Sequence, residues 1–156
     1  MVTLSVVIEK LRQVAVFAPE HAGGEALPDL MESYEDLLGS YPKIKDFPIY
    51  LEFLRTTAGA HIHNTDFSLV LYGLGGYVVP SFEEGLFLDK ERYFLFGEVL
   101  YTSQPDATYF FAFDFQSKRD IVYVSKNEGA TYTSCTPSFI DLLLDFASAR
   151  YPGHVA

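Results

Sequence analysis

The stretch TYFFAFDF at residues 108–115 carries the strongest structural pattern of the chain. Side chains of an extended strand alternate between its two faces, so one face here is entirely aromatic, with Tyr109, Phe111, Phe113 and Phe115. The other face carries Phe110, Ala112 and Asp114. Two largely apolar faces are typical of a strand that is covered on both sides. We therefore expect this segment to lie inside a β-sheet rather than at its edge.

Runs of aromatic and β-branched residues continue on both sides of this strand, separated by Gly, Pro, Asp and Asn. They predict further strands at residues 61–71, 77–79, 93–100, 121–126 and 131–135. The polar spans DFQSKRDI and SKNEGAT are typical of hairpin loops, so the last three strands should form an antiparallel meander. The sequence therefore predicts a mostly antiparallel sheet of about five to six strands.

Helical periodicity dominates the chain before this β-rich region and returns after it. Apolar residues at three- and four-residue spacing predict amphipathic helices at 2–17, 29–38 and 48–57, with Asp46 as a candidate N-cap of the third. A last helix begins after Thr136 and can cover one face of the sheet. Helices, then a sheet, then a helix define one α+β domain over residues 1–156, with the C-terminal helix packed on the sheet.

The net charge limits the kinds of partner. The 156 residues include 21 acidic and 11 basic side chains, which gives a formal net charge of −10. Direct binding to nucleic acid is not expected, because such binding depends on clustered Lys and Arg that neutralise phosphates. A basic protein partner suits this charge, although solubility alone also favours an acidic surface. Acidic residues exceed basic ones in every third of the chain, so we expect the folded surface to carry the excess.

The cysteine content and the N-terminus indicate the compartment. Cys135 is the single cysteine and cannot form an internal disulfide, which fits a reducing cytoplasm. The apolar N-terminal run is interrupted by Glu9, Lys10 and Arg12, so no signal peptide is expected. No segment approaches the roughly 20 apolar residues of a membrane span. We therefore expect a cytoplasmic protein without a membrane segment.

The segment HIHNTD is the main candidate for a metal site. His61 and His63 would project from one face of a strand, and Asp66 offers an oxygen ligand. A catalytic zinc site needs three protein ligands, however, and the other histidines, His21 and His154, lie in a loop and in the tail. Ordinary strand histidines are the simpler interpretation. A small metal-dependent enzyme that uses the His61 and His63 pair remains an alternative.

Other catalytic patterns are missing from the sequence. The glycine-rich piece LYGLGGYV has neither the lysine nor the spacing of a phosphate-binding loop. The chain contains no G-x-S-x-G motif, and the neighbours of Cys135 include no base or cation that would activate its thiol. We therefore expect neither enzymatic activity nor a bound cofactor.

Acidic and aromatic residues are interleaved in SFEEGLFLDKERYFLFGEVLY, residues 81–101. A binder of a basic protein presents such a mixture, because charges steer the encounter and Tyr or Phe supply buried contacts. Core aromatics with solvated acids are the commoner explanation of such a stretch. The first candidate group for partner binding is Glu83, Glu84, Asp89, Glu91 and Glu98. The second is Glu32, Glu35 and Asp36, for which a solvated helix face is a sufficient explanation.

The order of several motifs resembles the SUKH superfamily, which is named after yeast cell-wall-synthesis regulators of the Smi/Knr type. Its members show an acidic helix ending in Leu-Gly, a Leu-Pro step, a helix with a Phe-Leu pair and a turn of small residues. The matching positions here are Glu35, Leu38 and Gly39, then Phe47 and Pro48, then Phe53 and Leu54, then Ala58, Gly59 and Ala60. With YFLFGEV, YFFAFDF, IVYV and SFIDLLLDF as later strands and closing helix, the resemblance spans about residues 28–148. Two departures are a longer connector at 40–46 and a turn without the usual Asn.

The resemblance implies a function. Bacterial members are largely immunity proteins of polymorphic toxin systems, which bind a cognate secreted toxin, often a nuclease, and block it. The family has no associated catalytic residues, so the expected mechanism is stoichiometric inhibition by an acidic, aromatic-bearing surface that covers the basic cleft of the toxin. A housekeeping interaction module or regulatory scaffold of the same fold is the alternative. The sequence leaves the oligomeric state open.

Overall fold

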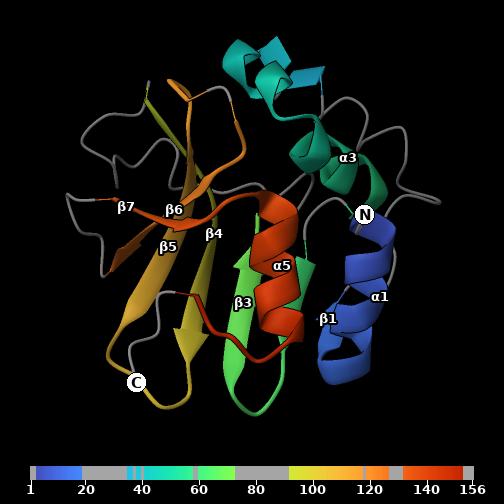
Figure 1. The fold of residues 1–156 in the computed structure, drawn as a ribbon, viewed down its shortest axis with the longest axis vertical. Helices are drawn as coiled ribbons and strands as arrows, with labels where there is room; N and C mark the ends of the chain where they lie inside the picture. The colour runs from blue at the N-terminus through green and yellow to red at the C-terminus, as the bar shows by residue number, and fades with distance from the viewer. Residues whose placement is uncertain are drawn as a thin grey trace.

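A computed structural model describes residues 3–18, 35–36, 38–39, 41–57, 60–72, 92–117, 119–126 and 132–152. Its elements are α1 (Leu4–Val14), β1 (Val16–Ala18), the 3-10 helix η2 (Pro42–Asp46), α3 (Pro48–Thr57), β2 (Ala60–His63), β3 (Phe67–Leu71), β4 (Tyr93–Tyr101), β5 (Thr108–Asp114), β6 (Val122–Lys126), β7 (Thr133–Thr136) and α5 (Phe139–Ala147). The predicted α+β class is confirmed, because the described helices accompany a single antiparallel sheet, with α1 before its first strand and α5 after its last (Figure 1).

The strands of the described residues form one seven-stranded sheet in chain order, and each strand is antiparallel to its neighbours. As predicted, β5 is an interior strand and β5, β6 and β7 form a meander. The prediction of five to six strands was too low for two reasons. The run 61–71 is divided into β2 and β3, and β1 occupies residues that we predicted as the end of the first helix. The strand predicted at 77–79 lies outside the described residues.

Side-chain hydrogen bonds explain two of the boundaries between these elements. The side chain of Asn64 divides β2 from β3, because its Oδ1 accepts hydrogen bonds from the backbone N–H groups of Asp66 at 2.8 Å and Phe67 at 3.2 Å. Helix α5 begins after Ser138, whose Oγ accepts a hydrogen bond from the N–H of Asp141 at 3.1 Å. Helix α3 has the predicted bounds, but Asp46 ends η2 instead of capping α3.

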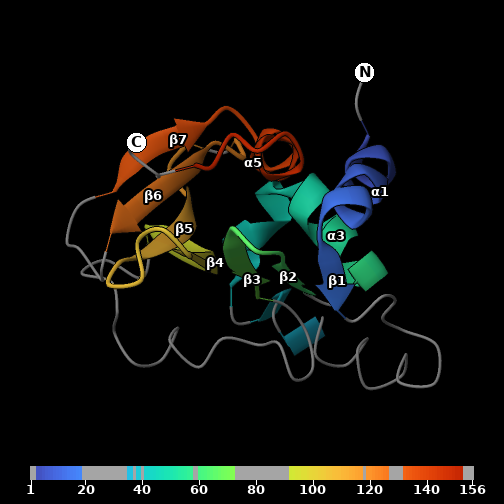
Figure 2. The ribbon, with the colours of Figure 1, turned by 90° about the horizontal axis from the view of Figure 1, so that it is seen from below.

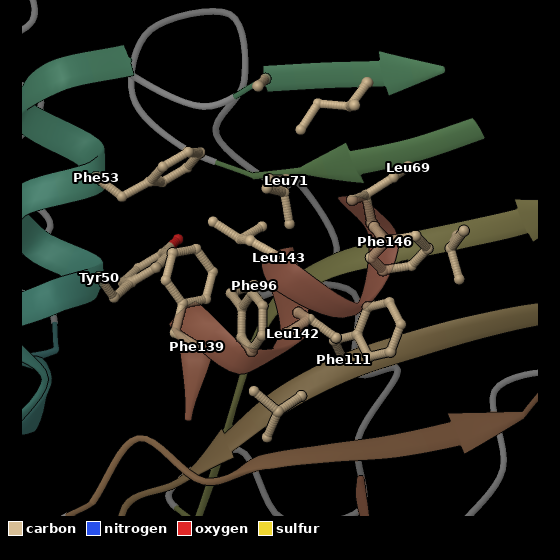
Figure 3. Packing of buried hydrophobic residues seen from close by; sticks show 14 of the residues in the cluster. Tyr50, Phe53, Leu69, Leu71, Phe96, Phe111, Phe139, Leu142, Leu143 and Phe146 are labelled. Atoms are coloured by element: carbon tan, nitrogen blue, oxygen red, sulfur yellow. The ribbon is translucent and has the colours of Figure 1, made fainter. Parts of the chain in front are cut away.

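The core lies on one face of the sheet, where α1, α3 and α5 are gathered (Figure 2). Helix α5 contacts both the sheet and α1. Aromatic rings dominate this core (Figure 3): the ring centroids of Phe96 and Phe113 are 4.2 Å apart, and Tyr50 of α3 meets Phe139 of α5 at 5.5 Å. The helices therefore cover the side of the sheet that carries the wholly aromatic face of TYFFAFDF.

We call the opposite side of the sheet the second face. Its apolar cluster contains Tyr72, Leu95, Phe110 and Ala112, with Val70, Tyr93 and Tyr132 packed against them. Among the described residues, no helical residue belongs to this cluster. The described side chains of the second face that remain partly exposed include Val70, Tyr93 and Tyr132.

Alkaline pH is expected to destabilise the protein, because burial raises the pKa of Tyr50 well above the value of about 10 in an unfolded chain. Its hydroxyl is buried and donates to the Tyr72 carbonyl at 2.9 Å. The unfolded chain loses this proton near pH 10 and the folded chain does not, so the stabilisation is complete below about pH 10 and is lost as the pH rises further. Urea unfolding at about pH 8 and about pH 11 should show a lower midpoint at the higher pH.

The matched variant for this prediction is Tyr50→Phe, which removes the ionisable group and keeps the ring. The urea midpoint should fall less between the two pH values in the variant, because unfolding no longer releases a proton from residue 50. The same midpoint at both pH values in the unmodified protein would contradict the prediction.

Candidate functional site

Most of the predicted acidic residues lie outside the described residues: Glu83, Glu84, Asp89 and Glu91 of the first group, and Glu32 of the second. Glu35 and Asp36 are exposed and helical, as predicted. Glu98 is the member of the first group that the structure describes, and it lies half-buried in the middle of β4. The candidate site is therefore built outward from Glu98.

A β-bulge in β4 decides the face on which Glu98 lies. Regular alternation from the buried Phe94 and Phe96 would also place Glu98 in the core. In the structure, the register with β5 shifts between Leu95 and Gly97, so Leu95 and Glu98 both lie on the second face. Strict alternation could not predict this placement. The signal that would have found it is a glycine inside a strand, which often marks a bulge.

The carboxylate of Glu98 has a phenol as its partner. The Tyr72 hydroxyl donates to Glu98 Oε1 at 2.5 Å, and Glu98 lies opposite Val70 of β3 and Phe110 of β5. Burial, and then this hydrogen bond and the charge of Glu98, raise the pKa of Tyr72, so its hydroxyl stays a donor. Among the described residues, no Lys or Arg forms an ion pair with Glu98. A half-buried carboxylate thus sits among apolar side chains without a cation in the described part of the chain.

Tyrosine rings lie on the same face. Tyr93 stacks on Tyr132 with ring centroids 4.5 Å apart and meets Tyr123 at 6.1 Å, and all three are half-buried. The Arg92 guanidinium lies 5.1 Å from the centre of the Tyr93 ring and pairs with the buried Asp114 at 3.2 Å. Such amphipathic rings supply both apolar area and hydroxyl groups to a protein interface.

The histidine pair lies toward one end of the second face. His61 and His63 share that face, as predicted, with ring centroids 4.9 Å apart. His61 Nε2 lies 2.7 Å from Ser68 Oγ of the next strand. Both rings line an open groove of about 480 Å³, together with Leu100 and Pro105. Partial burial, and then the charge of His63, lower the pKa of His61.

The structure does not bring Asp66 together with His61 and His63 in one site, as the sequence had suggested. Asp66 follows β2 in the turn to β3, where its Oδ2 accepts a hydrogen bond from the Tyr151 hydroxyl at 2.7 Å. It lines a second groove of about 340 Å³, to which neither histidine contributes. In the part of the chain that the structure describes, no three His, Cys, Asp or Glu residues are grouped to hold a metal ion. No observation therefore favours the three-ligand metal enzyme.

Comparison with protein-family models, with curated proteins and with solved structures gives no match for this chain. The resemblance to the SUKH superfamily therefore stays a prediction from the order of motifs. None of the helices in the described ranges is long and apolar enough to cross a membrane.

Proposed function

We propose that this chain is a non-catalytic protein-binding domain, an immunity protein that binds and neutralises a cognate basic toxin such as a nuclease in the cytoplasm. The observation that carries the proposal is the half-buried Glu98 carboxylate, which has a phenol and no described cation as its partner. A partly buried carboxylate loses some of its hydration, which is unfavourable. A Lys or Arg that forms a hydrogen bond with the carboxylate offsets that loss. A basic side chain of a partner can supply this cation.

The distribution of charge along the sequence supports an acidic binding surface. Residues 19–34 and 73–91 contain eight of the 21 acidic residues and one of the 11 basic residues. The acidic members are Glu20, Glu25, Asp29, Glu32, Glu83, Glu84, Asp89 and Glu91. Acidic groups in such numbers raise the rate of encounter with a basic partner.

The strand directions bring the neighbours of these two segments to one end of the sheet. β1 and β3 are both antiparallel to β2, so they run in the same direction. Ala18 therefore lies at the same end of the sheet as Leu71, and these residues come just before the two acidic segments. The motif resemblance supports a toxin as the partner, and a housekeeping partner on the same fold is the alternative.

A growth experiment distinguishes a toxin from a housekeeping protein as the partner. Under the proposal, a gene beside the one for this chain encodes a protein with a basic toxic domain. Expression of that domain should arrest the growth of host cells, and coexpression of this chain should restore it. If no neighbouring gene encodes such a domain, or if coexpression leaves the arrest unchanged, the toxin assignment is wrong and the housekeeping alternative is favoured.

Charge reversal at Glu98 is expected to weaken the complex. Glu98→Lys places a cation where the partner presents one, so the affinity should fall by about 2–5 kcal/mol, or at least roughly thirtyfold. The matched control is Glu9→Lys, which makes the same charge change at an exposed site of α1 on the other side of the sheet. Glu9→Lys should change the dissociation constant by less than about threefold. Equal effects of both variants would show that only net charge matters.

A further inference from the structure

We propose that His61 and His63 form a two-histidine binding site for a divalent transition-metal ion such as Cu²⁺, Ni²⁺ or Zn²⁺, with Ser68 as a positioning residue. The site needs no third carboxylate, so it does not depend on Asp66. It is also independent of the proposed toxin, because both metal ligands belong to one strand of this chain.

The separation of the two rings matches a shared metal ion. A metal ion lies about 2.0–2.1 Å from a ligating imidazole nitrogen, and therefore about 3.2 Å from the ring centroid. Two rings that bind one ion at an angle of about 90–110° then have centroids about 4.5–5.2 Å apart. The centroids of His61 and His63 are 4.9 Å apart. The separation of the two rings therefore agrees with one shared ion.

The backbone of the two ligands is held on both sides. In the sheet, β2 lies between β1 and β3, with Val16 opposite His63 and Val70 opposite His61. A strand inside a sheet holds metal ligands in more precise positions than a loop does. Because side chains at i and i+2 leave a strand on the same face, both imidazoles project to the same side of the sheet.

Ser68 can hold the His61 ring in a form that binds a metal. When His61 Nε2 carries the proton and donates to Ser68 Oγ, at 2.7 Å, Nδ1 keeps a free lone pair. Ligating histidines usually donate their second ring N–H in this way, which fixes the orientation of the ring. The open groove of about 480 Å³ leaves room for water at the remaining coordination positions.

The test is calorimetric titration of the full chain with Cu²⁺, Ni²⁺ and Zn²⁺ salts near neutral pH. We expect one ion per chain, with Cu²⁺ bound most tightly in accordance with the usual order of affinities. His61→Gln and His63→Gln should each weaken binding at least about tenfold, because one ligand of two is lost. The control is the double variant His21→Gln with His154→Gln, which removes the other two histidines and should change the affinity by less than about twofold.

Two further variants test whether the Ser68 hydroxyl positions the His61 ring. Ser68→Ala removes the acceptor for His61 and should weaken metal binding by up to about tenfold. Ser68→Thr keeps a hydroxyl, so its affinity for the metal should stay close to that of the unmodified chain. As a measurement that needs no variant, Cu²⁺ should broaden the proton resonances of His61 and His63 before those of the other histidines. Full binding by the His61→Gln, His63→Gln double variant, or loss of binding in the His21→Gln, His154→Gln variant, would overturn the proposal.

Discussion

Replacement of Phe96 by alanine is expected to lower the free energy of unfolding by about 3–5 kcal/mol. The side chain is fully buried and meets rings from three other elements. Its centroid lies 5.7 Å from Tyr50 and 5.5 Å from Phe139 (Figure 3), and 4.2 Å from Phe113. Alanine leaves a cavity among rigid rings that cannot close around it. Since a domain of this kind is stable by about 5–15 kcal/mol, the loss is a large part of the total.

Chemical denaturation of the purified variant measures this effect. The control is Leu100→Ala on the same strand, because Leu100 is 42% exposed on the second face. That substitution should cost less than about 1 kcal/mol. Similar costs for the two variants would show that the helices do not cover the face of β4 on which Phe96 lies.

Gly97→Ala is expected to destabilise the protein by about 1–3 kcal/mol, because the new methyl group meets a neighbouring backbone. A Cβ atom at Gly97 would lie 2.9 Å from the Val70 carbonyl oxygen and 3.1 Å from Leu71 Cδ2. Relief of this contact requires a shift of β4 against β3, and the bulge that turns Glu98 to the second face lies at the same place. The variant should therefore also bind the partner more weakly.

Gly39→Ala provides the matched control for this substitution. Its Cβ atom would have no neighbour within 4 Å, and the residue is helical, so alanine should be neutral or stabilising by up to about 1 kcal/mol. Denaturation midpoints of the two variants give the comparison. An unchanged midpoint for Gly97→Ala would contradict the close approach of β3 and β4.

The fold class followed from periodicity wherever the pattern was long. The alternation in TYFFAFDF predicted an interior strand with one wholly aromatic face, and the pattern of residues 48–57 predicted the bounds of α3. Shorter elements depended on contacts that no local pattern encodes. β1 has three residues and exists because Val16, Phe17 and Ala18 pair with β2. A helical reading of those residues could not anticipate a partner more than 40 residues away in the chain.

The candidate sites were less accessible to sequence reasoning than the fold. That the histidines share one face follows from their spacing, but the contact between His61 and Ser68 depends on the register of β2 against β3. Asp66 is close to the histidines in sequence and is nevertheless directed to Tyr151, 85 positions away. The face of the sheet on which Glu98 lies depends on the bulge at Gly97. Pairing register and bulges are tertiary properties, so an alternation pattern cannot supply them.

The most direct test of the proposed function is a calorimetric titration of this chain with the purified basic domain encoded beside it, at about 50 mM and about 300 mM salt. We predict a one-to-one complex that weakens as the salt concentration rises and that is at least roughly thirtyfold weaker with Glu98→Lys than with the unmodified chain. The absence of a complex, or equal affinity of the unmodified and Glu98→Lys chains, would contradict the role of Glu98 in neutralising a basic toxin.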